Sequence, residues 1–230
     1  MYSNNERLIV FDADGTIIDA YRVIVDTFTR HGMELGDLER FQKRHNLFKY
    51  LGGIKNFPFN LRKQIGKRSR KNILSTLTDV YRDDAKLYPG MAALIRTLVA
   101  TTGIRVGLVT RNITNEPMLT IRKTLSRHDI DLDAFDFAVH VPLAEEKTIA
   151  LRSARKRFDI NPARCYACGD EHKDFTSAIA AGMHAFIGSY GFEDHTRLTK
   201  KFKVPEDVIS RTPEDLSNRV LHALDIGQVE

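Results

Sequence analysis

Short apolar runs recur along the chain, and each has the length of a buried β-strand. The expected strands are Leu8–Phe11, Ile104–Val109, Phe135–Val141, Cys165–Cys168 and His184–Ile187. Apolar residues at helical spacing predict helices at Met91–Thr101, Met118–Ser126, Lys147–Phe158, Phe175–Ala181 and Pro213–Leu224. Strands that alternate with helices predict an α/β fold, with a three-layer, Rossmann-like core built on a parallel sheet.

The alternation stops between Asp19 and Lys86, where only helical patterns occur. Two apolar helical faces are expected in this segment, formed by Tyr21, Val25 and Phe28 and by Ile73, Leu74, Leu77, Val80 and Tyr81. The segment is therefore predicted to be an inserted, mainly α-helical cap domain at residues 19–86. Residues 1–18 and 87–230 would form the core domain, and Tyr88-Pro89-Gly90 and the turn at Thr16–Asp19 would form the hinge.

Composition is compatible with a globular protein, since 42% of the 230 residues are hydrophobic and can build a core. No apolar run reaches the roughly 18 residues of a membrane span, and the first residues lack the apolar stretch of a secretory signal. We therefore expect a cytoplasmic protein that does not enter a membrane. Monomer and homodimer both remain open.

Positive charge is concentrated in the expected cap. The whole chain carries +5, yet Leu38–Asn72 contains eleven Lys or Arg and one acid, Glu39. A solvated helical face would explain this excess. A surface that attracts the anionic groups of a substrate, or a nucleic acid terminus, would explain it equally well.

The two cysteines, Cys165 and Cys168, have a C-x-x-C spacing. Because they lie within one expected strand and no second pair is available to complete a zinc site, we interpret them as small buried apolar residues.

The first candidate catalytic residues stand at the end of the first strand, where Asp12 and Asp14 flank Ala13 and precede Gly15. Ligands of open α/β sheets bind beyond the carboxyl ends of the strands, so both acids are aimed at the expected site. A polar turn that closes the strand would give the same pattern.

A second acidic cluster favours chemistry over a simple turn. Asp170 and Asp174 follow the strand Cys165–Cys168, and oxygen ligands from two neighbouring strand ends suit Mg²⁺. Between the two clusters stand Thr110, at the end of another strand, and Lys147. Taken alone, Thr110 would be an ordinary strand end and Lys147 a solvated helix start.

With these four motifs in order, the chain from Leu8 to about Gly188 resembles the haloacid dehalogenase superfamily, and its helical cap resembles that of phosphoglycolate-phosphatase-like members. The resemblance implies that Asp12 is the nucleophile, which forms an aspartyl phosphate, and that Asp14 is the general acid and base. It also implies that Thr110 binds a phosphoryl oxygen and that Lys147 neutralises charge. Mg²⁺ would be held by Asp12, Asp170, Asp174 and the backbone carbonyl of Asp14, with Asp174 the looser ligand.

The chain departs from the family pattern at two places. Thr148 follows Lys147 where the family often has proline, and Arg111 separates Thr110 from Asn112. Arg111, with Asn112, is a candidate substrate-binding residue because its guanidinium could bind a second anionic group of the substrate. A surface arginine at a helix start is the other interpretation of Arg111.

The function expected from these residues is a Mg²⁺-dependent phosphatase that hydrolyses a small phosphorylated metabolite. Two alternatives remain. One is a phosphomutase or phosphonate hydrolase of the same superfamily, and the other is a protein that binds nucleic acid or another anionic polymer through the basic cap. We expect a small phosphorylated molecule, rather than nucleic acid, as the main partner.

Overall fold

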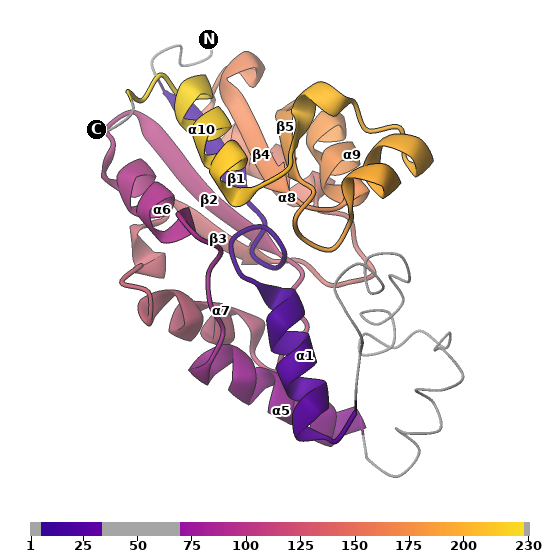
Figure 1. Ribbon diagram of the computed structural model, residues 1–230. Helices are drawn as coiled ribbons and strands as arrows, with labels where there is room; N and C mark the ends of the chain where they lie inside the picture. Colours follow the sequence, from indigo (N-terminus) through magenta and orange to yellow (C-terminus); the bar gives the residue numbers. More distant parts are fainter. Residues whose placement is uncertain (1–5, 34–69, 228–230) are drawn as a thin grey trace.

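A parallel β-sheet runs through the computed structural model, which describes residues 6–33 and 70–227 (Figure 1). Its six strands follow the order β3-β2-β1-β4-β5-β6, and every neighbouring pair is parallel. They are β1 (Arg7–Phe11), β2 (Ile104–Thr110), β3 (Phe137–His140), β4 (Cys165–Gly169), β5 (His184–Gly188) and β6 (Ile209–Ser210). The predicted Rossmann-like α/β fold is confirmed.

Helices cover both faces of this sheet. They are α1 (Ala20–Arg30), α5 (Arg70–Asp83), α6 (Met91–Ala100), α7 (Pro117–Ser126), α8 (Thr148–Phe158), α9 (His172–Ala181) and α10 (Pro213–Ala223). Short 3₁₀ turns occupy Leu132–Ala134, Pro162–Arg164 and Glu206–Val208, and a π-helical turn occupies Arg197–Lys201. Buried residues of α6, α7 and α10 share one apolar cluster with the sheet, and those of α8 and α9 share the other.

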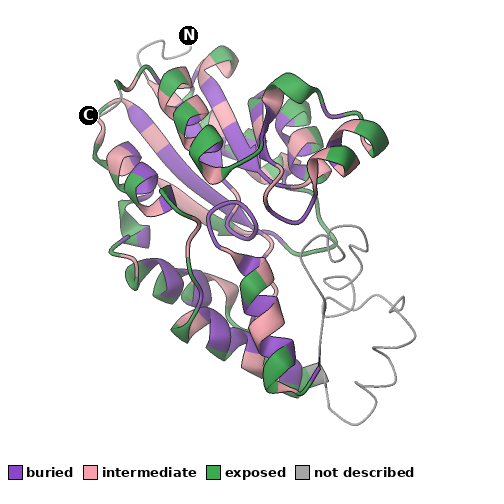
Figure 2. Ribbon diagram, in the orientation of Figure 1, coloured by how far each residue is buried: buried purple, intermediate pink, exposed green. Residues whose placement is uncertain are grey.

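Strand β1 shows why the core has two halves. Its residues alternate in direction, so Ile9 and Phe11 enter the cluster with α6, α7 and α10, whereas Leu8 and Val10 enter the cluster with α8 and α9. All four side chains are at most 1% exposed, and the central strands are mostly buried in Figure 2. A strand buried on both faces explains the continuous apolar run in the sequence.

Several element boundaries differ from the sequence prediction. Strand β3 begins at Phe137 rather than Phe135, because a 3₁₀ turn precedes it and Asp136 accepts a hydrogen bond from Val106 N through its side chain, at 2.8 Å. Helix α9 begins at His172 rather than Phe175. Strand β6 was not predicted, since two residues are too short to produce a pattern.

The described parts of the expected cap are α1 and α5, which pack against each other, while α5 also packs against α7. The predicted face of α5 is largely buried. On α1, Phe28 is buried as predicted, but Tyr21 and Val25 are only half-buried, because the helix turns Val23 and Ile24 toward the core instead.

The two chain segments that connect this helical pair to the core lie side by side. Asp19 N donates to Lys86 O and Tyr88 N donates to Ile17 O, both at 2.9 Å. The division into core and cap stays a prediction, as does the hinge. Most of the basic window, residues 38–69, lies outside the described residues.

Both cysteines are buried free thiols, but they point to opposite faces of β4. Cys168 enters the cluster with α6 and Cys165 the cluster with α8. Positions three apart on a strand face opposite ways, so the pair cannot share a disulfide or a metal. Among the described residues, no helix is both long and apolar enough to cross a membrane.

Candidate active site

The candidate site lies where the order of strands reverses. Starting at β1, the chain first adds β2 and β3 on one side of the sheet and then β4 to β6 on the other. The crevice beyond the carboxyl ends of β1 and β4 is therefore the topological switch point at which such sheets bind ligands. Asp12 directly follows β1, Asp170 directly follows β4, and Thr110 ends β2.

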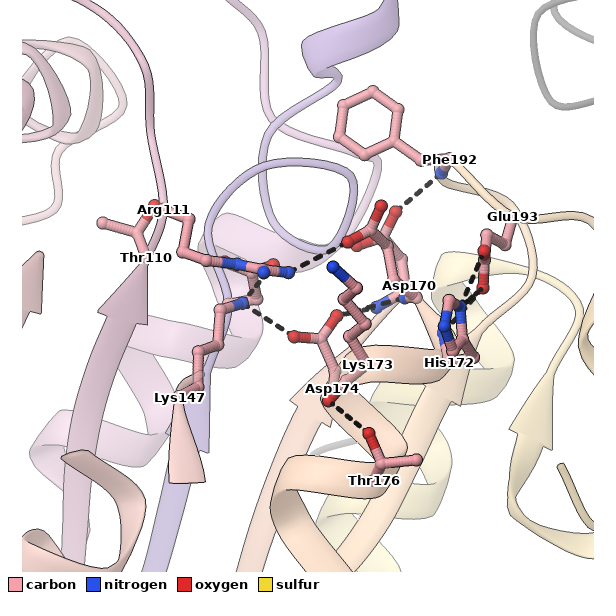
Figure 3. Close-up of polar contacts among 12 residues, drawn as sticks. Thr110, Arg111, Lys147, Asp170, His172, Lys173, Asp174, Thr176, Phe192 and Glu193 are labelled. Carbon is pink, nitrogen blue, oxygen red and sulfur yellow. Dashed lines mark hydrogen bonds and ion pairs between the residues drawn. The ribbon is translucent and has the colours of Figure 1, made fainter. Parts of the chain in front are cut away.

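Three carboxylates meet in this crevice. One oxygen each of Asp12, Asp170 and Asp174 can be chosen so that all three lie within 4.8 Å of one another. Figure 3 shows Arg111 and Asp170, which follow β2 and β4, directed toward Lys147, just before α8, and Asp174, in the first turn of α9. The structure thus brings together acids that lie far apart in the sequence.

Asp170 is fully buried and firmly held. Its Oδ2 accepts a hydrogen bond from Phe192 N at 2.6 Å, and its Oδ1 lies 3.5 Å from Thr16 Oγ1. Gly15 allows this close approach, since its φ is +79° and a Cβ there would lie 2.2 Å from Asp170 Oδ2. Burial, followed by the nearby acids, raises the pKa of Asp170 well above its usual value.

The loop that brings Phe192 to Asp170 is tied to α9. Glu193 is fully buried and accepts from His172 N at 2.6 Å and from Arg197 Nε at 3.2 Å. Its Oε1 also lies 2.9 Å from His172 Nδ1 (Figure 3). These contacts hold the loop in place, and with it the Phe192 N–H group that donates to Asp170.

Asp174 also forms the start of α9. Its Oδ2 accepts from Glu171 N at 3.1 Å and from Asp170 N at 3.3 Å, while its Oδ1 accepts from Lys147 Nζ at 2.7 Å. Free backbone N–H groups at a helix start favour such an acceptor. Because its oxygens already have protein donors, Asp174 is compatible with the looser metal contact that the family resemblance implies.

Lys147 is 4% exposed and lies between two acids. Its Nζ is 2.6 Å from Asp12 Oδ2 and 2.7 Å from Asp174 Oδ1. Burial alone would lower the pKa of Lys147, but Asp12 and Asp174 outweigh burial and raise it. Burial raises the pKa of Asp12 to about 7 even though Lys147 acts in the opposite direction. The site therefore favours additional positive charge.

The carboxylate of Asp14 lies apart from the three-acid cluster. Its Oδ1 accepts from Tyr81 Oη at 2.9 Å, and Asn112 Nδ2 lies 3.0 Å from Oδ2 and 3.3 Å from Oδ1. Burial raises the pKa of Asp14 to about 6, although both donors favour the ionised form. A carboxyl group that is ionised part of the time near neutral pH suits proton transfer.

Thr110 and the two residues after it make different contacts. Thr110 Oγ1 is buried and accepts from Asn112 N at 3.1 Å. Arg111 pairs with Glu171 through Nη2 at 3.0 Å, and its side chain is 13% exposed. Asn112 is 1% exposed and directs its amide to Asp14, so its described contacts are with the protein.

Sequence reasoning missed two groups at this site. Tyr81 was assigned only to the apolar face of its helix, although a phenol in an apolar face generally needs a partner for its hydroxyl, and this was the available signal. The backbone amide of Phe192 gave no signal, because any residue except proline can supply one.

Comparison with known proteins identifies the family. The haloacid dehalogenase-like hydrolase family matches residues 6–182. A curated relative, phosphoglycolate phosphatase of Nitrosospira multiformis, is 25% identical over 201 residues, which cover 82% of this chain and 85% of the relative. Together these findings confirm the predicted superfamily and the predicted phosphatase class of enzyme.

Solved structures show the same fold. A putative phosphoglycolate phosphatase from Lactobacillus delbrueckii superposes with a TM-score of 0.63 at 18% identity, covering 94% of this chain and 98% of its own. CbbY from Rhodobacter sphaeroides, solved in complex with phosphate, superposes with a TM-score of 0.63 at 19% identity, covering 96% of this chain and 99% of its own. The putative β-phosphoglucomutase from Thermotoga maritima superposes with a TM-score of 0.58 at 18% identity, covering 94% of this chain and 99% of its own. This chain belongs to the haloacid dehalogenase-like hydrolase family.

Proposed function

We propose that this enzyme is a Mg²⁺-dependent phosphomonoesterase that acts on a small phosphorylated metabolite through an aspartyl-phosphate intermediate. The observation that carries the proposal is the position of Asp12, which lies beside Lys147 and within the three-acid cluster at the switch point. The reaction needs a carboxylate nucleophile next to positive charge, and Asp12 beside Lys147 would meet both needs.

The donor set fits a small divalent cation. Asp12, Asp170 and Asp174 offer hard oxygen ligands, and burial raises the pKa of Asp12 and Asp170, so a cation would stabilise their ionised forms. The family resemblance implies that the backbone carbonyl of Asp14 is a further ligand and that the ion is Mg²⁺. When bound, the ion would supply charge that offsets the repulsion between Asp12 and the phosphate dianion.

The protein residues would then act in two steps. Asp12 attacks phosphorus and forms an O–P bond while the ester O–P bond breaks, and Asp14 gives its proton to the departing oxygen. In the second step Asp14 takes a proton from water, the water oxygen attacks phosphorus, and the bond from Asp12 to phosphorus breaks. Thr110 would bind a phosphoryl oxygen, while Lys147 would offset charge on the phosphoryl group and on Asp12.

The candidate substrate class comes from the relatives. The curated relative is a phosphoglycolate phosphatase, so phosphorylated small acids are the first substrates to test. Arg111 supports this choice, since a guanidinium beside the crevice suits a second anionic group on the substrate. The fold also resembles that of a putative β-phosphoglucomutase, so a mutase that moves a phosphoryl group within a sugar phosphate is the second candidate function.

Phosphate release tests this proposal. The purified full chain would be assayed with phosphorylated acids, sugar phosphates and nucleotides, with Mg²⁺ or with chelator, beside the variant Asp12→Asn. We expect release of inorganic phosphate that requires metal and is lost in the variant. Retained activity in Asp12→Asn would contradict the mechanism, and an isomerised sugar phosphate without phosphate release would favour the mutase.

A further inference from the structure

Helix α5 supplies a buried hydroxyl to the reaction's expected proton donor. Tyr81, on α5, is 1% exposed, and its Oη donates to Asp14 Oδ1 at 2.9 Å. The helix is held beside the loop after β2 and beside α7 by other contacts. Asn115 N donates to Thr78 Oγ1 at 2.9 Å, and Arg82 Nε donates to Thr120 Oγ1 at 3.1 Å.

Asn112 holds the same carboxyl group from the other side. Its side-chain oxygen accepts from Thr114 N at 3.0 Å, and this contact fixes which end of the amide faces Asp14. The NH₂ group must therefore point toward Asp14, where it lies 3.0 Å from Oδ2. His140 Nε2 lies 3.0 Å from Asn112 O and supports the backbone of the same residue.

We propose that Tyr81 and Asn112 are positioning residues that fix the orientation of the Asp14 carboxyl group for proton transfer to the leaving oxygen. The inference rests on the proposed function and deepens it, because it makes α5 part of the proton-transfer apparatus rather than only a packing element. The two oxygens of this carboxyl group have different donors, with the Tyr81 hydroxyl at Oδ1 and the Asn112 amide nearer to Oδ2.

The path of the proton shows which step would slow if the Asp14 carboxyl group lost its orientation. In the first step the ester O–P bond breaks as the bond between Asp12 and phosphorus forms, and the proton passes from Asp14 to the departing oxygen. An alkoxide is a poor leaving group and needs this proton, whereas p-nitrophenolate leaves readily without it. Misplacing Asp14 should therefore slow cleavage of alkyl phosphates much more than cleavage of p-nitrophenyl phosphate.

The test compares kcat/KM for an alkyl phosphate and for p-nitrophenyl phosphate in full-length Tyr81→Phe and Asn112→Ser. This ratio covers steps only up to release of the leaving group, so the later hydrolysis does not obscure the comparison. Tyr166→Phe is the control, since it also removes a hydroxyl hydrogen bond, the part-buried one from Tyr166 Oη to Ala223 O at 3.2 Å, but away from Asp14.

We expect both variants to lose roughly 10-fold to 100-fold on the alkyl phosphate and less than about threefold on p-nitrophenyl phosphate. Tyr166→Phe should treat the two substrates alike. Equal losses on both substrates, or no loss in either variant, would overturn the inference. Because Tyr81 and Asn112 belong to different parts of the fold, the inference can still be tested with one variant if the other fails to fold. Wild-type enzyme that releases no phosphate, or Asp12→Asn that retains activity, would instead overturn the proposed function itself.

Discussion

The Lys147 ammonium lies 2.6 Å from the Asp12 carboxylate, and both side chains are almost entirely withdrawn from solvent. Breaking a buried ion pair leaves an uncompensated charge, and this costs far more than the loss of a surface pair. The same ammonium also contacts Asp174, so one side chain links both acidic motifs.

Replacement of Lys147 by Met should therefore reduce activity and stability together. We expect kcat/KM for phosphate release to fall by about 10²-fold or more, because one preorganised positive charge is removed from the reacting groups. Thermal unfolding and phosphate release would be measured beside Lys173→Met, which removes an exposed lysine near the same site. Similar activity in the two variants would contradict the role given to Lys147.

Two glycines with positive φ offer a sharp test of how Asp170 is held. Gly15 has φ +79° and a Cβ there would meet Asp170 Oδ2, whereas Gly32 has φ +68° and no atom within 4 Å of an added Cβ. Gly32→Ala should cost only about 1 to 2 kcal/mol of unfolding free energy from backbone strain. Gly15→Ala adds a clash with Asp170 and should also abolish phosphate release, as measured by a steady-state assay of both purified variants.

Divalent metal should stabilise the folded protein. A ligand that binds only the native state adds roughly 2.7 kcal/mol at 100 times its dissociation constant, so Mg²⁺ should raise the Tm measurably. The increase should disappear in Asp170→Asn. Since Tm does not depend on turnover, this experiment separates metal binding from catalysis, and an equal rise in the variant would place the metal elsewhere.

Thiol labelling should be slow in the native protein. Burial raises the pKa of Cys165 to about 11 and that of Cys168 still further, so both remain neutral thiols at pH 8. As the pH rises from 9 toward 11, the thiolate form of Cys165 should increase and labelling with iodoacetamide should accelerate. Urea-unfolded protein would be labelled rapidly at pH 8, and fast labelling of native protein at that pH would contradict the burial.

The sequence contained enough information to predict the sheet and the acids at its edge. Strands buried on both faces leave continuous apolar runs, and Asp12 and Asp170 directly follow two of them. The partners of these acids could not be predicted, since Tyr81 and Phe192 act through three-dimensional proximity rather than spacing. Strand β6 depends on tertiary pairing with β5 and has no local signal. The assigned roles of the site residues remain predictions.

The contact between Thr16 and Asp170 joins residues 154 positions apart in the chain. Such distant contacts form late in folding, because the chain must first close a large loop. During synthesis from the N-terminus, Asp12 emerges early but lacks its acidic neighbours until β4 and α9 have been made. A nascent chain that ends before residue 165 lacks Asp170 and Asp174, so it cannot assemble the three-acid cluster around Asp12.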